Sequence, residues 1–203
     1  MAVRDVADLA TIGEVLLDEL YAVPDLDDVR VIVDLGSHIG SSIVFFRLRH
    51  PEARIYGVEP DPRTFASLKA NVGGLDGVTI DQRAAGGSDG ESTFFCSEYS
   101  IASSLVATAG PGHAVPVRTV SLDGLMEELR LERIDLLKLD VEGAEYDVLA
   151  HATRLDAVRA IAGELHPELI SPTPEEFFDL LRDFDVRVDR VSASSWQFQA
   201  RRA

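Results

Sequence analysis

Two pairs of side chains in the second half of the sequence have the types and the spacing that proton transfer requires. Lys138 and Asp140 are two residues apart, and so are Glu164 and His166. Residues two apart in a strand project from the same face, so each pair could act on one substrate. A histidine of near-neutral pKa can take the proton of a hydroxyl group, and a placed base contributes ~10²–10⁴-fold to a rate. We therefore expect these four residues to be catalytic, with His166 as the base.

The acids around the first pair also allow a purely structural interpretation. Asp140 could cap a helix that begins shortly after it. Glu142 and Glu145 would then be acids that favour the positive end of that helix, although Glu145 could equally act at the site. On this interpretation the segment contributes to stability and only Asp140 faces a bound cofactor.

A metal site is a further alternative. Asp140, Glu164 and His166 together could bind a hard divalent cation that lowers the pKa of an acceptor hydroxyl. Lys138 could equally neutralise these acids without a metal. The sequence leaves metal dependence undecided.

A glycine-containing segment, Asp34-Leu35-Gly36-Ser37-His38-Ile39-Gly40, follows a short apolar stretch and leads into an expected helix. Glycines at such a turn let the backbone approach a ligand closely. The segment lacks the middle glycine of the G-x-G-x-x-G dinucleotide pattern, and a strand-to-helix turn often needs a glycine for structural reasons alone. Its predicted ligand-binding residues are Asp34, Gly36, Ser37, His38 and Gly40.

Glu59 strengthens the prediction of a nucleoside site. It ends the second expected strand, where a carboxylate can accept hydrogen bonds from both ribose hydroxyls. Each such bond contributes roughly 1.5–3 kcal/mol. The structural alternative is an acid favoured near the N-terminus of the next helix. Arg83 and Ala84, at the end of the third expected strand, and Asp140, after the fourth, complete the predicted cofactor site.

The charge of Asp34 distinguishes two nucleoside cofactors. A pyrophosphate binds at glycine-lined turns and would be repelled by this carboxylate. S-adenosylmethionine carries an α-amino group, which a carboxylate attracts. We therefore expect S-adenosylmethionine and not NAD.

Strands and helices alternate along the chain, which predicts an α/β fold with a parallel sheet covered on both faces. Asp61 and Pro62 are expected to open the third helix as its N-cap and first residue. Two late segments alternate in hydrophobicity as a closing antiparallel pair does. The expected strands are 31–33, 54–58, 78–83, 134–139, 160–165, 186–191 and 196–200, and the expected helices are 8–21, 41–49, 61–72, 143–153 and 173–181.

We expect one domain over residues 1–203, because no linker, repeat or low-complexity tract interrupts the sequence. Residues 1–28 would form an N-terminal helical cap. Residues 86–120, rich in glycine and serine, are expected to be an irregular insertion with a short strand at 93–95. Irregular segments of this length are often functional, so this one is expected to shape the acceptor site.

Several of these segments together resemble the FkbM-type methyltransferases. The resemblance covers about residues 31–166 and rests on Val33 to Gly40, Val58-Glu59-Pro60, Ser103-Ser104-Leu105, Leu122-Asp123 and, most specifically, Ile134 to Glu145. It implies a Rossmann-like class I methyltransferase with a seven-stranded, mostly parallel sheet and an antiparallel C-terminal strand. It also implies S-adenosylmethionine as donor and a hydroxyl acceptor on a sugar or secondary metabolite. His38 stands where this family commonly has asparagine.

Composition narrows the class of partner. The net charge of −16, from 35 acidic and 19 basic residues, argues against nucleic acid, which requires a basic face. No apolar run is long enough to span a membrane, and no signal peptide is recognised. The single cysteine, Cys96, suits a reducing cytoplasm and is expected to be a buried small hydrophobe. We expect a small-molecule partner and a cytoplasmic location, and a homo-oligomer is compatible with the sequence.

Two other functions are compatible with the same sheet. The first is an NAD-dependent oxidoreductase, which the missing middle glycine and the lack of a Tyr-x-x-x-Lys pair disfavour. The second is a non-catalytic nucleoside-binding module. The leading hypothesis is an O-methyltransferase that acts on a small molecule.

Overall fold

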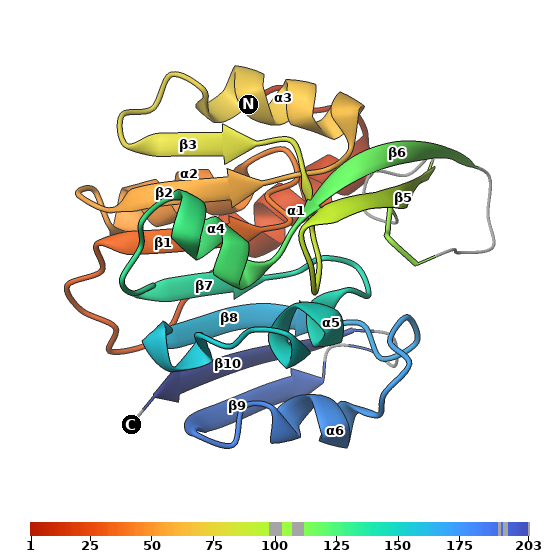
Figure 1. Cartoon of the computed structure of the whole chain (residues 1–203). Helices are drawn as coiled ribbons and strands as arrows, with labels where there is room; N and C mark the ends of the chain where they lie inside the picture. The colour runs from red at the N-terminus through yellow and green to blue at the C-terminus, as the bar shows by residue number, and fades with distance from the viewer. Residues whose placement is uncertain (98–102, 107–111, 191, 193–194, 203) are drawn as a thin grey trace.

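The computed structural model describes residues 1–97, 103–106, 112–190, 192 and 195–202. Figure 1 shows one large twisted sheet with helices on both sides and a smaller sheet at one end. None of the described helices is long and apolar enough to span a bilayer.

The large sheet has seven strands in the order β3-β2-β1-β7-β8-β10-β9. Neighbouring strands are parallel except at β10, which runs antiparallel to both β8 and β9. This confirms the predicted seven-stranded, mostly parallel sheet with an antiparallel C-terminal strand. The strands are β1 (Val31–Leu35), β2 (Arg54–Val58), β3 (Val78–Asp81), β7 (Leu136–Leu139), β8 (Ala160–Leu165), β9 (Phe184–Arg190) and β10 (Trp196–Arg202).

Alternation along the buried strands divides the core into two layers. Val33 and Leu35 of β1 face a cluster that includes residues of α4 (Leu122–Glu128), α5 (Glu145–Ala150) and α6 (Pro174–Asp179). Ile32 faces the opposite cluster, with residues of α1 (Val6–Leu16), α2 (Ser41–Arg49) and α3 (Pro62–Val72). Because both faces are covered, β1 is buried along its whole length.

Two helices with a recognisable N-cap residue, α3 and α6, begin where the sequence predicted. Asp61 caps α3 by accepting the N–H groups of Arg63 and Thr64, with Pro62 at the first position, as expected. Thr173 opens α6 through a capping box, also as expected. Helix α1 begins earlier than predicted because Asp5 caps it, and it ends at Leu16 and not at residue 21.

The prediction for the remaining helices was less accurate. Helix α5 has six residues and not the predicted 143–153, because Glu142 and Gly143 before it have positive φ angles. Helix α4 was not predicted, although Ser121 caps it by accepting the N–H of Gly124. The segment has only seven residues, too few for a clear helical periodicity.

The prediction of an irregular insertion at 86–120 was wrong in its described part except for the short strand at 93–95, which lies within β5. β5 (Gly90–Ser97) and β6 (Gly112–Val120) pair antiparallel, and β4 (Ala84–Ala85) pairs parallel with β6. In Figure 1 this second sheet lies on the side where the parallel strands of the large sheet end. Residues 98–102 and 107–111 of the insertion lie outside the described part of the chain. Cys96, at the end of β5, is buried as expected.

Strand register gathers the predicted site residues at one edge. Asp34 of β1 lies opposite Lys138 of β7, and Leu139 lies opposite Gly163 of β8. The segments after these strands therefore leave the sheet side by side, as the carboxyl ends of parallel strands do.

Candidate functional site

A cavity of about 420 Å³ opens at the carboxyl edge of the large sheet. A volume of this size is typical of small-molecule sites. The loop after β1, the ends of β2, β7 and β8, and the segment around Tyr21 all contribute to its lining. The lining also includes Ala84 of β4 and, from the segment between β5 and β6, Ser103 and Leu105, so the second sheet and this segment border the cavity.

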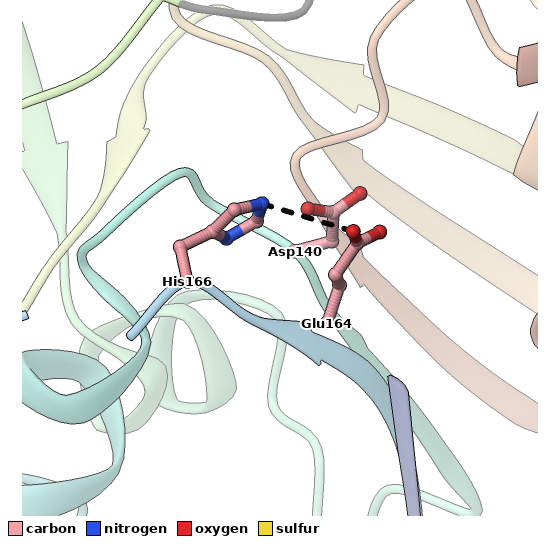
Figure 2. A group of neighbouring side chains, drawn as sticks. All are labelled: Asp140, Glu164 and His166. Atoms are coloured by element: carbon pink, nitrogen blue, oxygen red, sulfur yellow. Dashed lines mark ion pairs between the residues drawn. The ribbon is translucent and has the colours of Figure 1, made fainter. Parts of the chain in front are cut away.

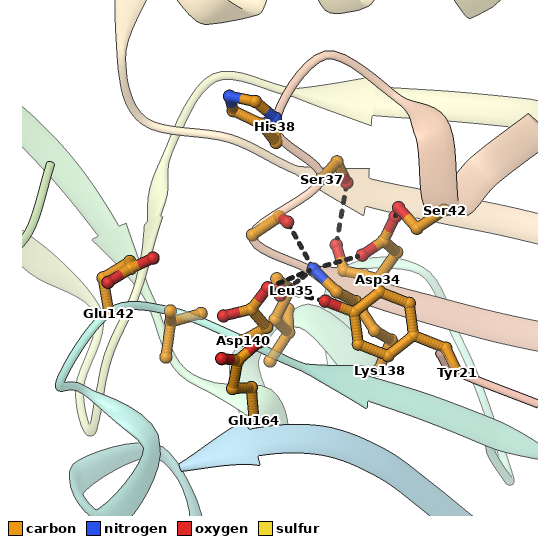
Figure 3. A network of polar contacts seen from close by, with 12 residues as sticks. Tyr21, Asp34, Leu35, Ser37, His38, Ser42, Lys138, Asp140, Glu142 and Glu164 are labelled. Atoms are coloured by element: carbon orange, nitrogen blue, oxygen red, sulfur yellow. Dashed lines mark hydrogen bonds and ion pairs between the residues drawn. The ribbon is translucent and has the colours of Figure 1, made fainter. Parts of the chain in front are cut away.

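The ammonium group of Lys138 is the centre of a buried network below this cavity (Figure 3). Its Nζ lies 3.3 Å from Asp34 Oδ1 and 3.5 Å from Asp140 Oδ2. It also donates to the backbone carbonyl oxygens of Leu35 and Gly36. Burial lowers the pKa of Lys138, but the two carboxylates outweigh burial and raise it. Lys138 is therefore a cation that ties β7 to the glycine loop.

Tyr21 closes this network from the N-terminal segment. Its hydroxyl donates to Asp140 Oδ2 at 2.8 Å, and the Lys138 ammonium lies 5.1 Å from the centre of its ring. Burial and the nearby Asp140 raise the pKa of Tyr21 well above its ordinary value, so it stays a neutral donor. Residues 1–28 were predicted to cap the site, and Tyr21 together with Thr11, Glu14, Val15 and Leu20 lines the cavity.

The loop after β1 is fixed by a residue in a left-handed conformation. His38 has φ of 49°, and its backbone N–H donates to Glu59 Oε2 at 3.0 Å. Its ring Nε2 lies 3.2 Å from Asp8 of α1, whose side chain is fully buried. Burial is the main cause that lowers the pKa of His38. His38 thus connects the N-terminal helix, the glycine loop and the end of β2.

Glu59 presents a carboxylate to the cavity with its orientation already set. Its Oε1 accepts the N–H of Asp61 at 2.9 Å, and its Oε2 accepts the N–H of His38. Each carboxylate oxygen can accept a second hydrogen bond, so a diol can still bind. Burial raises the pKa of Glu59 to about 7, although the two backbone donors oppose this shift.

Three residues that the sequence assigned to the cofactor lie, within the described part of the chain, outside the cavity lining. Asp34 is fully buried, and its carboxylate holds Lys138 and the hydroxyl of Ser42. Arg83 pairs with Asp81 and Glu128, away from the cavity. These contacts revise the expectation that Asp34 itself receives an amino group.

Gly40 is the third of these residues, and its role is packing. A Cβ there would lie 2.8 Å from Val72 and 2.9 Å from Leu68 of α3, and φ is +93°. Gly36 differs, because it lines the cavity and also packs tightly: a Cβ would lie 1.8 Å from the carbonyl oxygen of Asp140. Ser37, His38, Glu59 and Ala84, four of the residues assigned to the cofactor, line the cavity, and their contact with a cofactor stays a prediction.

The second predicted group, Asp140, Glu164 and His166, comes together as expected (Figure 2). One side-chain nitrogen or oxygen atom from each lies within 4.8 Å of the others. The His166 ring is held on both sides, since Nδ1 lies 2.8 Å from Glu145 Oε1 and Nε2 lies 3.4 Å from Glu142 Oε2. Glu145 is fully buried and also accepts the N–H groups of Val141 and Gly143.

These carboxylates change the expected role of His166. Burial lowers its pKa, but the hydrogen bond that its ring donates to Glu145, and the charges of Glu145, Glu142 and Asp140, outweigh burial and raise the pKa to about 10. At neutral pH His166 is therefore an imidazolium, which has no free lone pair. This charge disfavours His166 as the base, a role that stays a prediction.

Sequence reasoning missed two residues of the site. Tyr21 was counted as the end of an amphipathic helix, and nothing in its neighbours marks a contact with a strand more than a hundred residues away. Glu142 was interpreted as a helix-dipole acid, yet it precedes α5, lines the cavity and has φ of 53°. The Glu-Gly pair at 142–143 was the available signal, because glycine after a strand end often marks a sharp turn.

Comparison with known proteins finds similar sequences among methyltransferases. A sequence model described as "Methyltransferase FkbM domain" matches residues 34–188. "Methyltransferase 1" of Beauveria bassiana is 30% identical over 67% of this chain and 64% of its own length. "2-O-methyltransferase NoeI" of Sinorhizobium fredii is 33% identical over 59% of this chain and 56% of its own. The chain thus spans less than two thirds of either relative.

Solved structures share the fold at low sequence identity. The crystal structure of methyltransferase FkbM from Methylobacillus flagellatus has a TM-score of 0.60 at 14% identity, and the match covers 92% of this chain and 47% of that one. The fibrillarin of Aeropyrum pernix, described with natively bound S-adenosyl-L-methionine, has a TM-score of 0.54 at 16% identity and covers 94% and 74%. These neighbours are methyltransferase folds of the Rossmann-like class.

The charge state of His166 predicts a stability that depends on pH. We expect His166→Gln to lower the free energy of unfolding by about 3 kcal/mol at pH 6, because it breaks a buried charge pair. The corresponding fall in Tm is roughly 6–12 °C. Because folding raises the pKa of His166 from 6.5 to about 10, this stabilisation is complete below pH 6.5 and is lost as the pH rises to 10.

Thermal unfolding of both proteins from pH 6 to pH 10 measures this effect, and the gap in Tm should narrow as the pH rises. The control is His151→Gln, at an exposed position after α5, which should follow the unsubstituted protein throughout. A gap that stays constant with pH would contradict the charged state of His166.

Proposed function

Because the chain belongs to the family of methyltransferase FkbM domains, we propose that it transfers the methyl group of S-adenosylmethionine to a hydroxyl group of a small molecule such as a sugar or a secondary metabolite. The observation that carries this proposal is the cavity at the carboxyl edge, with a pre-oriented carboxylate at Glu59 and a second charged cluster at Asp140, Glu164 and His166. One end suits a nucleoside and the other suits a polar acceptor.

The donor would bind along the glycine loop. Glu59 accepts the two ribose hydroxyls through lone pairs that its backbone donors leave free. Gly36 and Ser37 let the backbone approach the ligand. Asp140 has 20% of its side chain exposed and is the carboxylate that can receive the α-amino group, since Asp34 is committed to Lys138. The structure of a fibrillarin with bound S-adenosyl-L-methionine supports this donor for the fold.

We propose oxygen as the acceptor atom for two reasons: the name of a relative and the polar side chains that line the cavity. A relative at 33% identity is named as a 2-O-methyltransferase. Methyl transfer from a sulfonium is an in-line displacement, so positioning the acceptor oxygen against the methyl group supplies much of the rate. The carboxylates and histidine at this end offer hydrogen bonds that would orient a polyol.

We propose further that the reaction needs no divalent metal. Asp140 already has Lys138 and the Tyr21 hydroxyl as partners, and His166 is held as a cation between two glutamates. An added divalent ion would have to displace or deprotonate the imidazolium. Asp140 and His166 of this cluster therefore already have charged partners in the chain itself.

The direct test is methyl transfer from isotopically labelled S-adenosylmethionine to a panel of hydroxylated glycosides, macrolides and polyols. We expect an alkali-stable methyl ether, and we expect neutral glycosides to exceed uronic acid glycosides in kcat/KM by roughly tenfold or more, since the lining carries Glu14, Asp140, Glu142, Glu164 and Glu168. Transfer to no hydroxyl compound, or tight NAD binding without any response to S-adenosylmethionine in calorimetry, would contradict the proposal.

The role of Glu59 is tested by donor affinity. Glu59→Gln should weaken S-adenosylmethionine binding by roughly 10- to 100-fold, because a charge-assisted pair of hydrogen bonds is lost. In the unsubstituted protein the affinity should fall as the pH drops below about 7, because the protonated carboxyl loses acceptor capacity. Calorimetry from pH 6 to pH 8 measures both effects. The exposed Glu52→Gln is the control, and a pH-independent affinity would refute the ribose assignment.

Metal independence is tested by exhaustive chelation. Protein treated with a chelator and freed of metal should keep full turnover, and added Mg²⁺ or Mn²⁺ should not raise the rate. Loss of turnover that a divalent ion restores would instead support the metal site.

A further inference from the structure

Glu142 has a backbone conformation that suits glycine and not glutamate. Its φ is 53°, and Gly143 after it has φ of 101°. A side chain in the left-handed region is unfavourable, and such residues concentrate at functional sites. Six described non-glycine residues have positive φ, and two of them, His38 and Glu142, line the cavity. His38 has a clear role in holding Glu59, so the question is what Glu142 does.

The peptide group between Glu142 and Gly143 is held by hydrogen bonds at both its carbonyl and its N–H. Its carbonyl oxygen accepts the hydroxyl of Ser104, a buried residue that pairs with Phe95 of β5. The N–H groups of Val141 and Gly143 both donate to the buried carboxylate of Glu145. This turn is therefore rigid, and it directs the Glu142 side chain to the cavity.

The Glu142 carboxylate also differs from the neighbouring carboxylates in its hydrogen-bond and ion-pair partners. Asp140 pairs with Lys138 and accepts the Tyr21 hydroxyl, and Glu164 accepts the hydroxyl of Ser195. Among the described contacts of the Glu142 carboxylate is the imidazolium Nε2 of His166, at 3.4 Å. The side chain is 28% exposed, and in Figure 3 it stands apart from the Lys138 network.

We propose that Glu142 is the general base that removes the proton of the acceptor hydroxyl. This inference rests on the proposed function. The carboxylate takes the hydroxyl proton as the acceptor oxygen forms its bond to the donor methyl carbon. The bond from that carbon to sulfur breaks, and its electron pair returns to sulfur. The products are a methyl ether, S-adenosylhomocysteine and a protonated Glu142, which then loses its proton to water.

The surroundings give this carboxylate an unusual affinity for a proton. Burial and the charges of Asp140, Glu145 and Glu164 raise the pKa of Glu142 to about 8, and the imidazolium of His166 opposes this shift. A base is most effective when its pKa lies near the working pH. Among the charged groups described around Glu142, His166 is the cation closest to it, and it would keep the ionised carboxylate oriented.

Two substitutions separate chemistry from structure. Glu142→Gln keeps the size of the side chain and removes the base. Glu142→Gly also relieves the left-handed conformation, so this variant should fold and should have a Tm at or above that of the unsubstituted protein. The matched control is Arg130→Gly, at an exposed residue that also has φ of 53° and lies after α4.

We expect kcat to fall ~10²–10⁴-fold in both Glu142 variants, with S-adenosylmethionine affinity by calorimetry unchanged within about twofold. The loss should shrink for acceptors with a more acidic hydroxyl, such as phenols, because these need less help to ionise. Formate or acetate should restore part of the rate in Glu142→Gly. Arg130→Gly should keep full kcat with a similar change in Tm.

Three results would overturn the inference: full kcat in Glu142→Gln, an equal loss for acidic and ordinary hydroxyls, or a loss explained by weaker donor binding. Failure of the proposed function looks different. In that case the unsubstituted protein would methylate no hydroxyl compound, and the variants would have no rate to lose.

Discussion

The ammonium group of Lys138 holds together segments that lie far apart in the sequence. It is 2% exposed and contacts Asp34 of β1, Asp140 after β7 and two carbonyl oxygens of the glycine loop. A buried cation without partners would be costly, and so would either carboxylate alone. The pairs are therefore interdependent, and the loop, the end of β7 and the Tyr21 hydroxyl must take their places together. The shape of the cavity above this network therefore depends on these contacts forming together.

A second group of charged side chains, around His166, lies next to Asp140. Glu145 fixes one nitrogen of His166 and also caps the turn at 141–143, so the helix start and the histidine are positioned by the same buried carboxylate. The acids that contact Lys138 and His166 differ in how exposed their carboxylates are. Asp34 and Glu145 are fully buried and structural, whereas Glu142 and Glu164 retain 28% and 21% of their side-chain exposure and remain accessible to a ligand.

The sequence predicts the fold better than it predicts the site, and particular residues show why. Strand alternation and the Asp61 cap are local signals, so the large sheet and α3 were predicted with nearly correct boundaries. Only the short strand at 93–95 of β5 was predicted, and its pairing with β6 was missed, because the first half of β5 is exposed and lacks an alternating apolar pattern. The role of Asp34 depends on its register with Lys138, and the charge of His166 depends on Glu145, 21 residues earlier. Both are properties of tertiary contacts, which spacing along one chain does not specify.

Non-glycine residues with a positive φ angle also indicate where tertiary contacts or function determine the local structure. Native sequences are mostly consistent from propensity to packing, and departures concentrate where function imposes another requirement. His38 and Glu142 both have the left-handed backbone that glycine adopts most easily, and each is adjacent to a tightly packed turn. At His38 the conformation turns a backbone N–H toward the Glu59 carboxylate, at the proposed donor end of the cavity. At Glu142, which lines the same cavity, it directs a carboxylate to the proposed acceptor end. A glycine at either position would remove the unfavourable backbone conformation. At Glu142 it would also remove the carboxylate that we propose as the base.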